Sequence, residues 1–301
     1  MSYILRLDVI DWAPEVPITD DEALEAHRAY RALHAAFALE ETYDLLVSNF
    51  LELDQEALCA ASNYVDRTYE EFFEERARAN RRIVNLLTAA RLYLDHAPQR
   101  LSECASNPED ANGEFKKTAA SQFDSRFSYR FMEALRNHVQ HSSLAVHVVR
   151  YNTQRTGMKA ASIYETRLSM ISKREFFEEN KQFGKRILAE MPATVELLQA
   201  SREYLEGLSA VHDKIREIIN TPTLEAREVF QRLIQIYASV NEGETLGLSV
   251  IDISGNERKK VTPVFLEWDD VRLKLVARNT TLTKLGTRVA ASRLDIPWKP
   301  D

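Results

Sequence analysis

Few residues in this chain can interrupt a helix. Of its 301 residues, 8 are glycine and 9 are proline, and the plentiful residues Ala, Leu, Glu and Arg lose little conformational entropy in a helix. The composition therefore favours helices over sheets. We predict a mainly α fold, a helical bundle to which one or two β-hairpins are added.

Helix caps and prolines mark where the predicted helices begin and end. A first long helix begins at Thr19 or Asp20, and acidic residues fill its first turn, where they favour the helix N-terminus. A second helical stretch runs from about Leu53 to His96, is broken once near 64–68, and is followed by Pro98. Further helices are expected from near Thr118 to at least Ser143, from the capping box at Ser172–Glu175 toward Glu190, from about Thr194 to Ile219 and from Thr223 to Asn241.

Alternating apolar and polar residues predict strands at both ends of the chain and in its middle. The expected strands cover residues 3–12, then 144–154 with 162–171 as a hairpin, and 246–253 with 260–266 as another. Continuation of the preceding helix is the alternative for the middle hairpin. Asp269 or Asp270 then caps a last helix that includes Val289. The chain is thus divided into an extended arm or strand (1–18), a helical bundle (19–243) and a C-terminal hairpin-plus-helix region (244–301).

Cysteine usage and hydropathy bear on the cellular compartment. Cys59 and Cys104 are far apart and match no metal-ligand spacing, which fits a reducing compartment. The N-terminal residues include Arg6 and Asp8 and do not form a secretory signal. No apolar run approaches the roughly 18 residues that a membrane span requires. We expect a cytoplasmic protein without a membrane partner, a cofactor or a bound metal.

Charge is distributed unevenly along the chain. The net charge is −7, which argues against broad non-specific binding of nucleic acid. Residues 116–159, however, hold eight basic and two acidic side chains, so this basic segment carries +6 and the rest of the chain −13. A local positive field attracts a polyanion even on an acidic protein. Pairing of these charges with acidic helices elsewhere is the alternative.

The basic segment contains one short motif that points to chemistry. Arg136, Asn137 and His141 lie on one predicted helix, and Asn137 and His141 share a stripe of it. An arginine five to seven residues before a histidine occurs three times in the chain, close to chance, so the amide at Asn137 and the basic surroundings single this copy out. The candidate substrate-binding residues of the same segment are Arg126, Arg130 and Gln140.

Helical geometry limits what one copy of this motif can do. At 100° per residue, Arg136 and His141 point about 140° apart, so one isolated helix does not aim both at the same atom. The predicted core face of this helix also includes His138, which we expect to be a buried, satisfied histidine. The other members of that face are Phe131, Met132, Leu135, Val139 and Val146.

The stretch Leu135-Arg136-Asn137-His138-Val139-Gln140-His141 resembles the motif of the HEPN superfamily (higher eukaryotes and prokaryotes nucleotide-binding). The family pattern is an arginine, a polar residue that is often asparagine, three variable residues and a histidine. The resemblance covers the motif and the helices from about Leu53 to Ser143. Some toxins of the family carry a modifiable tyrosine two residues after the histidine, where this chain has Ser143.

The resemblance implies a helical bundle that dimerises so that two copies of the motif face each other. It also implies metal-independent cleavage of RNA, in which the ribose 2′-hydroxyl attacks the adjacent phosphate. In that chemistry a histidine transfers protons near neutral pH and a guanidinium stabilises charge on the phosphate. Asn137 would orient the histidine or the substrate.

Two functions are therefore expected from the sequence. The first is a HEPN-like endoribonuclease, an RNA-cleaving effector or toxin, with Arg136, His141 and Asn137 as catalytic residues, RNA as substrate and a second copy of the chain as partner. A further protein that restrains its activity would fit this function. The alternative is a non-catalytic helical protein that dimerises and binds another partner. In that case the motif is only a solvated polar face of its helix.

Overall fold

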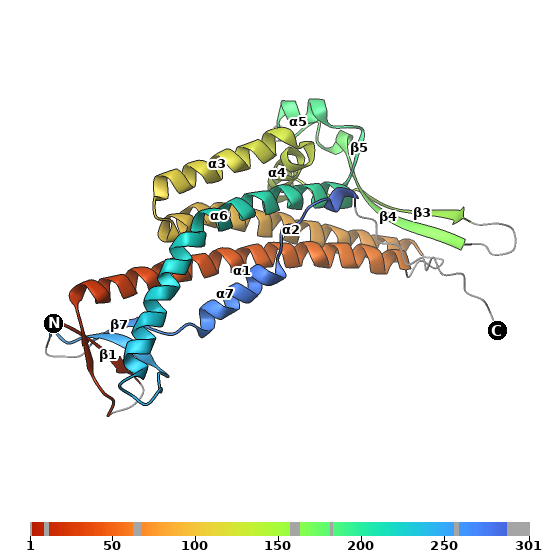
Figure 1. The fold of residues 1–301 in the computed structure, drawn as a ribbon. Helices are drawn as coiled ribbons and strands as arrows, with labels where there is room; N and C mark the ends of the chain where they lie inside the picture. Colours follow the sequence, from red (N-terminus) through yellow and green to blue (C-terminus); the bar gives the residue numbers. More distant parts are fainter. Residues whose placement is uncertain are drawn as a thin grey trace, which may run out of the picture.

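The computed structural model describes residues 2–8, 12–62, 68–156, 163–180, 183–255 and 259–287. These residues form a mainly helical molecule with two small antiparallel sheets, as predicted (Figure 1). Long helices lie along the body, one sheet lies near the N-terminus, and a hairpin projects from the opposite end. None of the helices in the described ranges combines the length and the apolarity needed to cross a bilayer.

Three long helices form the body: α1 (Asp20–Ser62), α2 (Tyr69–Cys104) and α6 (Leu197–Ala238). α1 and α2 run antiparallel, and ion pairs such as Arg78–Glu56 (3.2 Å) follow their outer edge. All three helices contribute fully buried leucines to one hydrophobic core. Burial of this apolar face stabilises the helices more than their intrinsic propensity does.

Reciprocal side-chain hydrogen bonds begin both α1 and α2. The Thr19 hydroxyl accepts the N–H of Glu22 (3.2 Å), and the Glu22 carboxylate accepts the N–H of Thr19 (2.8 Å). Thr68 and Glu71 form the same capping box at the start of α2. Such pairs satisfy backbone donors that the first helical turn leaves free. The predicted start of the first helix is confirmed. The predicted break near 64–68 falls mostly on residues 63–67, which lie outside the described ranges, and α2 begins after Thr68.

Two prolines, one that follows a predicted helix and one that lies between two predicted helices, are inside helices. α2 continues past Pro98 to Cys104, which is buried in the core, so packing offsets the backbone hydrogen bond that proline cannot make. Pro222 lies within α6, which is one bent helix rather than the two predicted (Figure 1). Beside it the Thr223 hydroxyl donates to the carbonyl of Ile219 (2.8 Å), and such a side-chain bond to the carbonyl four residues earlier often accompanies a bend in a helix.

The helix predicted from Thr118 to Ser143 is in fact two helices, α3 (Pro108–Ser125) and α4 (Phe127–His141). Between them Arg126 has an extended backbone (φ −120°, ψ 116°), so α4 begins in a new direction. α3 also begins earlier than expected. Its N-cap Asn107 accepts two backbone N–H groups of the first turn, and a proline follows at the first helical position.

The first sheet joins the two ends of the chain. Its strand order is β2-β1-β6-β7, so the N-terminal strand pairs with the C-terminal hairpin. The predicted strand and hairpin are confirmed, but the sequence did not predict that they pair. Leu5 lies opposite Val250, and both side chains are fully buried against Phe230 from the second half of α6. The strands are β1 (Tyr3–Leu7), β2 (Val16–Ile18), β6 (Leu248–Asp252) and β7 (Lys259–Pro263).

The second sheet follows α4 and has the order β3-β4-β5. The hairpin of β3 (Val148–Thr156) and β4 (Ile163–Lys173) is confirmed, and β5 (Thr194–Glu196) adds a short third strand. The predicted helix that starts with a capping box at Ser172 is wrong. Ser172 pairs with β5 and its hydroxyl donates to the carbonyl of Ala145 (2.9 Å), so it belongs to the sheet. Among the described residues between β4 and β5, the helical segments are the 3₁₀ turn η1 (Arg174–Phe176) and the short helix α5 (Lys185–Glu190).

The last helix, α7 (Glu267–Arg278), is shorter than predicted. Asp269 and Asp270 do not cap it but lie in its first turn, where both pair with Arg227 of α6. After Arg278 the chain leaves the helix, and Val289 lies outside the described residues. Residues 279–287, which include the turn η2 (Leu285–Thr287), are called the C-terminal strap below.

The C-terminal strap runs back along one face of α6. The Thr281 hydroxyl donates to Asp213 (2.9 Å), the N–H of Leu282 donates to Ser209 (2.9 Å), and the N–H of Gly286 donates to Glu206 (3.0 Å). These acceptors are three or four residues apart, so they form one polar stripe of the helix. The strap thus covers a stripe that would otherwise face solvent.

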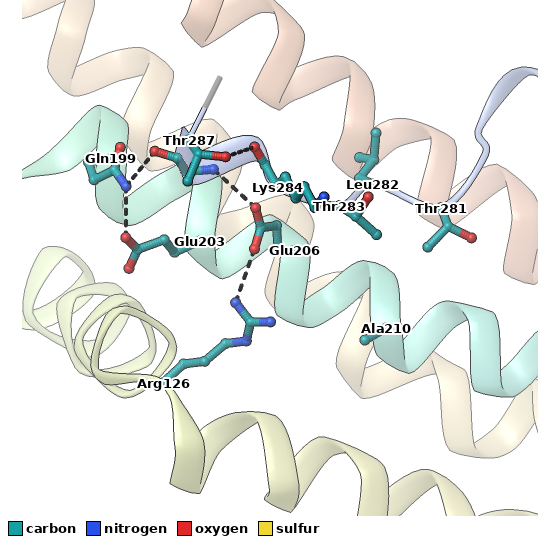
Figure 2. Close-up of a pocket in the computed structure, with 11 residues that line it drawn as sticks. Arg126, Gln199, Glu203, Glu206, Ala210, Thr281, Leu282, Thr283, Lys284 and Thr287 are labelled. Atoms are coloured by element: carbon teal, nitrogen blue, oxygen red, sulfur yellow. Dashed lines mark hydrogen bonds and ion pairs between the residues drawn. The ribbon is translucent and has the colours of Figure 1, made fainter. Parts of the chain in front are cut away.

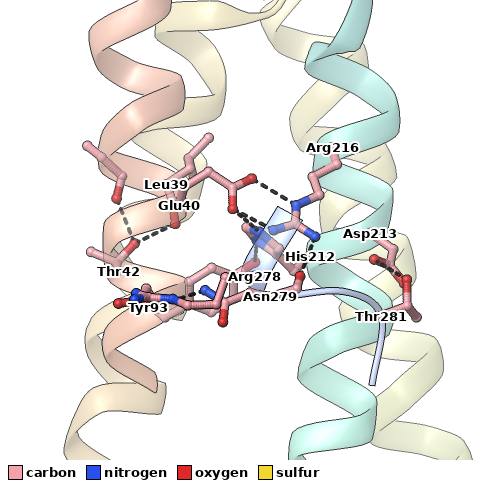
Figure 3. A network of polar contacts seen from close by, with 12 residues as sticks. Leu39, Glu40, Thr42, Tyr93, His212, Asp213, Arg216, Arg278, Asn279 and Thr281 are labelled. Carbon is pink, nitrogen blue, oxygen red and sulfur yellow. Dashed lines mark hydrogen bonds and ion pairs between the residues drawn. The ribbon is translucent and has the colours of Figure 1, made fainter. Parts of the chain in front are cut away.

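A buried polar network links α1, α2, α6 and the strap (Figure 3). Arg216 holds the Glu40 carboxylate with two hydrogen bonds (2.8 and 2.6 Å) and donates to the carbonyl of Asn279 (2.7 Å). His212 lies 3.2 Å from Glu40, and its other ring nitrogen lies 3.0 Å from the Tyr93 hydroxyl. Burial alone would raise the pKa of Glu40, but Arg216 and His212 outweigh it and lower this pKa to about 2.

We expect Arg216→Met to lower the free energy of unfolding by about 3–5 kcal/mol, because Glu40 would keep a buried charge without its main partner. The double variant Glu40→Leu/Arg216→Met removes both charges and should lose much less. Urea unfolding followed by circular dichroism measures both values. If the double variant is as unstable as the single one, the pair does not act as this structure indicates.

Candidate functional site

The motif occupies the last turns of α4, and the two faces of this helix differ sharply. Phe131, Met132 and Leu135 are fully buried, as predicted for the core face. Asn137 and His141, together with Gln140, are exposed to solvent, whereas Arg136 is partly buried. His141 is the last residue of the helix, and Ser142 caps it. Asn137, Gln140 and His141 are therefore open to solvent, and Arg136 is partly so.

Asn137 holds the Arg136 side chain. A guanidinium Nη1 of Arg136 donates to the Asn137 side-chain oxygen (2.9 Å), and the Nε of Arg136 is buried with no hydrogen-bond partner among the described residues. The hydrogen bond therefore holds the tip of the arginine, while its Nε is covered by the surrounding chain. This arrangement suits a group that positions an anion, because little conformational freedom remains to be lost on binding.

Beneath the motif lies a buried carboxyl group. Burial raises the pKa of Glu133, although the hydrogen bond from Tyr204 and the charges of Arg91 and Arg136 oppose the rise. Glu133 lies on the half of the helix opposite its apolar core face. That half, however, packs partly against α6 and α2, so Glu133 is covered rather than solvated.

Two of the predicted substrate-binding residues are engaged inside the fold. Arg130 is 8% exposed, pairs with Glu190 (2.6 Å) and donates to two carbonyls of the last turn of α3, which satisfies acceptors that a helix end leaves free. Arg126 pairs with Glu206 of α6 (3.1 Å). Of the three predicted residues, only Gln140 presents its side chain to solvent beside the motif. We therefore leave Arg126 and Arg130 out of the candidate site.

His138 is buried, as expected, and belongs to a histidine–phenylalanine cluster under the motif. Its Nδ1 lies 2.7 Å from the amide nitrogen of Asn180, and its ring meets the edge of Phe177. His147, which follows α4, accepts the N–H of Lys173 (2.9 Å) and stacks on Phe176. Burial lowers the pKa of both histidines, that of His147 to about 4. Both rings are therefore neutral and structural near neutral pH.

A second candidate is a cavity of about 510 Å³ between α6, the start of α4 and the C-terminal strap (Figure 2). Its carboxylates are already engaged. Glu206 accepts from Arg126 and from the strap, and Glu203 accepts from Gln199 (2.8 Å) and from Ser128. Because these groups bind one another, the cavity offers a ligand few open polar contacts. We therefore describe the cavity as the place where the C-terminal strap packs against the helical bundle, rather than as a binding site.

Neither the cavity nor the buried network was expected from the sequence. Glu40 is 172 residues from His212, and no local pattern announces that the two meet. The one available signal was His212 on the otherwise apolar face of α6 that includes Leu205 and Leu208. Within the described ranges, no three His, Cys, Asp or Glu side chains come together in a way that could hold a metal ion. The exposed end of α4 is therefore the better candidate site.

We expect His147 to make stability depend on pH. Its folded pKa, about 4, lies below the ordinary value of 6.5, so the unfolded chain binds more protons in this interval. The stabilising contribution is complete above pH 6.5 and is lost as pH falls toward 4. His147→Asn, which keeps an acceptor for the N–H of Lys173, should flatten the change in unfolding free energy between these pH values. Equal pH profiles for the two proteins would contradict the assignment.

No family model, curated protein or solved structure matches this chain. The function proposed below is argued from the residues and the geometry of the chain itself.

Proposed function

We propose that the protein is a HEPN-like, metal-independent endoribonuclease that acts as a dimer. The observation that carries the proposal is the exposed end of α4. Asn137 fixes Arg136 there by a side-chain hydrogen bond, and His141 stands on the open last turn of the same helix. The neighbouring basic residues Arg126 and Arg130 are engaged inside the fold, so this motif is distinct from an ordinary salt-bridged helix face.

Each side chain has a definite chemical task in this proposal. Arg136 binds the phosphate and stabilises the charge that develops on it. His141 moves a proton between the ribose 2′-hydroxyl or the leaving 5′-oxygen and solvent. The 2′-oxygen forms a bond to phosphorus while the bond to the 5′-oxygen breaks, which leaves a 2′,3′-cyclic phosphate and a 5′-hydroxyl. Gln140, exposed on the same face, would contact the substrate.

The proposal requires a second copy of the chain. Arg136 and His141 are five residues apart on α4, so they point about 140° apart and are offset by about 7.5 Å along the axis. A two-fold arrangement of two α4 ends would bring the arginine of one protomer beside the histidine of the other. The two free cysteines, Cys59 and Cys104, agree with a cytoplasmic location, which remains part of the proposal.

A non-catalytic interaction protein is the second candidate, and one observation favours it. Large apolar side chains are exposed in the last part of α1 and at the start of α2, as on surfaces that bind another protein. They are Leu51, Leu58, Tyr69 and Phe73, which are 50–89% exposed. This candidate predicts partner binding without RNA cleavage.

The purified protein should cleave single-stranded RNA in EDTA and leave a cyclic phosphate end. Arg136→Ala and His141→Ala should each lower the rate by about 10²–10⁴-fold, because each removes a group that acts on the reacting phosphate. Arg31→Ala and His96→Ala are matched controls, since both residues are exposed and lie on other helices. Cleavage that persists in both motif variants would exclude this mechanism, and cleavage by none of the proteins would favour the interaction protein.

Mixing two inactive variants tests the shared site. If each site takes Arg136 from one protomer and His141 from the other, a mixed dimer of Arg136→Ala and His141→Ala chains regains one of its two sites. Half of the dimers are mixed after random exchange, so activity should return to about a quarter of wild type. The control is each variant mixed with itself. No recovery, with subunit exchange verified by mass spectrometry, would rule out a site shared between chains.

A further inference from the structure

α1 and α6 lie side by side and run in opposite directions. Glu40, near the middle of α1, pairs with Arg216 of α6 (2.6 Å), and Asp54, nearer the end of α1, pairs with Arg202 (2.5 Å). Later positions of α1 therefore lie beside earlier positions of α6. Gln199, three residues before Arg202, is level with the last turns of α1.

The C-terminal strap follows α1 toward its end (Figure 1). At its start the side-chain amide of Asn279 donates to Asp44 of α1 (2.7 Å), and near its end the carbonyl of Gly286 accepts from Gln199 (2.9 Å). Between these two contacts the strap passes successively earlier positions of α6, so it advances along α1. Thr287, the last described residue, is therefore level with the last turns of α1.

One stripe of α1 is uncovered beyond its contact with the strap. Asp44, Leu51 and Leu58 are seven residues apart, so consecutive members lie about 20° apart around the helix. The strap holds Asp44, whereas Leu51 is 58% exposed and Leu58 is 50% exposed. Val47, four residues before Leu51, is buried in the core shared with α6. Leu51 and Leu58, called the apolar edge below, thus border the face that α6 covers.

The chain that follows the strap has apolar residues of its own. Residues 288–301 lie outside the described ranges. Their sequence contains Leu294, Ile296 and Trp298, separated by Asp295 and Pro297. This alternation is typical of an extended segment with one apolar face. At about 3.3 Å per residue such a segment covers about 13 Å from the first to the third apolar residue. Seven residues of a helix cover about 10.5 Å, so the segment matches the apolar edge in length.

We propose that residues 288–301 dock on the end of α1, where Leu294, Ile296 and Trp298 cover the apolar edge. Eleven extended residues after Thr287 reach about 36 Å, which is ample for a surface that begins level with Thr287. Removal of both sets of apolar side chains from water drives the contact. The inference is independent of the proposed function. It assigns to a contact within the chain two of the leucines that favour the interaction protein.

The fluorescence of Trp298 tests the docking. The emission spectrum of the protein minus that of its Trp298→Phe variant isolates this indole, and the difference should peak at a shorter wavelength than N-acetyltryptophanamide. Leu51→Ser/Leu58→Ser should shift the peak to that of the free compound. Leu24→Ser/Leu45→Ser is the matched control and should leave it unchanged, because these exposed leucines point to other sides of α1.

Unfolding in urea tests the same contact without relying on one indole. Leu294→Ser/Ile296→Ser should lower the unfolding midpoint of the protein, and should have no further effect once Leu51→Ser/Leu58→Ser is present. Losses that simply add would mean that the two segments do not touch, and would overturn the proposal.

Two fluorescence results would also overturn it. The first is a Trp298 peak that already equals that of N-acetyltryptophanamide in the unaltered protein. The second is a short-wavelength peak that moves to longer wavelength on dilution, which would assign the apolar edge to a second copy of the chain. Neither measurement involves RNA, so failure of this inference and failure of the proposed function are separate results.

Discussion

The pair formed by Glu40 and Arg216 joins two of the three long helices across 176 residues of sequence. It fixes α1 against α6 in the core, and the remaining guanidinium N–H holds the carbonyl of Asn279 at the start of the C-terminal strap. A buried charge pair has few alternative partners, so it fixes register as well as contact. His212 and Tyr93 extend this constraint to α2. The frame on which α4 rests therefore depends on this interaction.

α4 shows how one helix serves both the fold and a candidate site. Its apolar face is fully buried, and Glu133 on its edge is covered by α6 and bonded to Tyr204. Only the last turns are open, because the chain turns away after His141 to form the hairpin. Neighbouring basic side chains are divided between these two roles. Arg130 stabilises the end of α3, while Arg136 is held by Asn137 at the surface.

The sequence predicted the features that depend on neighbouring residues. The cap at Thr19, the hairpins and the buried position of His138 were confirmed, since each follows from local hydrogen bonding or from the alternation of side chains. The predictions from sequence were wrong where tertiary packing overrides the local preference of residues for helix or strand. Pro98 and Pro222 lie inside helices because the core holds the chain on both sides of them. Ser172 resembles a helix cap but belongs to a strand, because its hydroxyl binds the carbonyl of Ala145.

The sequence by itself determined a mainly helical chain, a basic segment and a motif of Arg136, Asn137 and His141, because these depend on composition and on short spacings. Only the tertiary structure decided which charges of that segment remain available. Glu190 and Glu206 are distant in sequence, and they neutralise Arg130 and Arg126 once the helices pack. Burial and pairing are properties of the assembled core, which no local pattern contains.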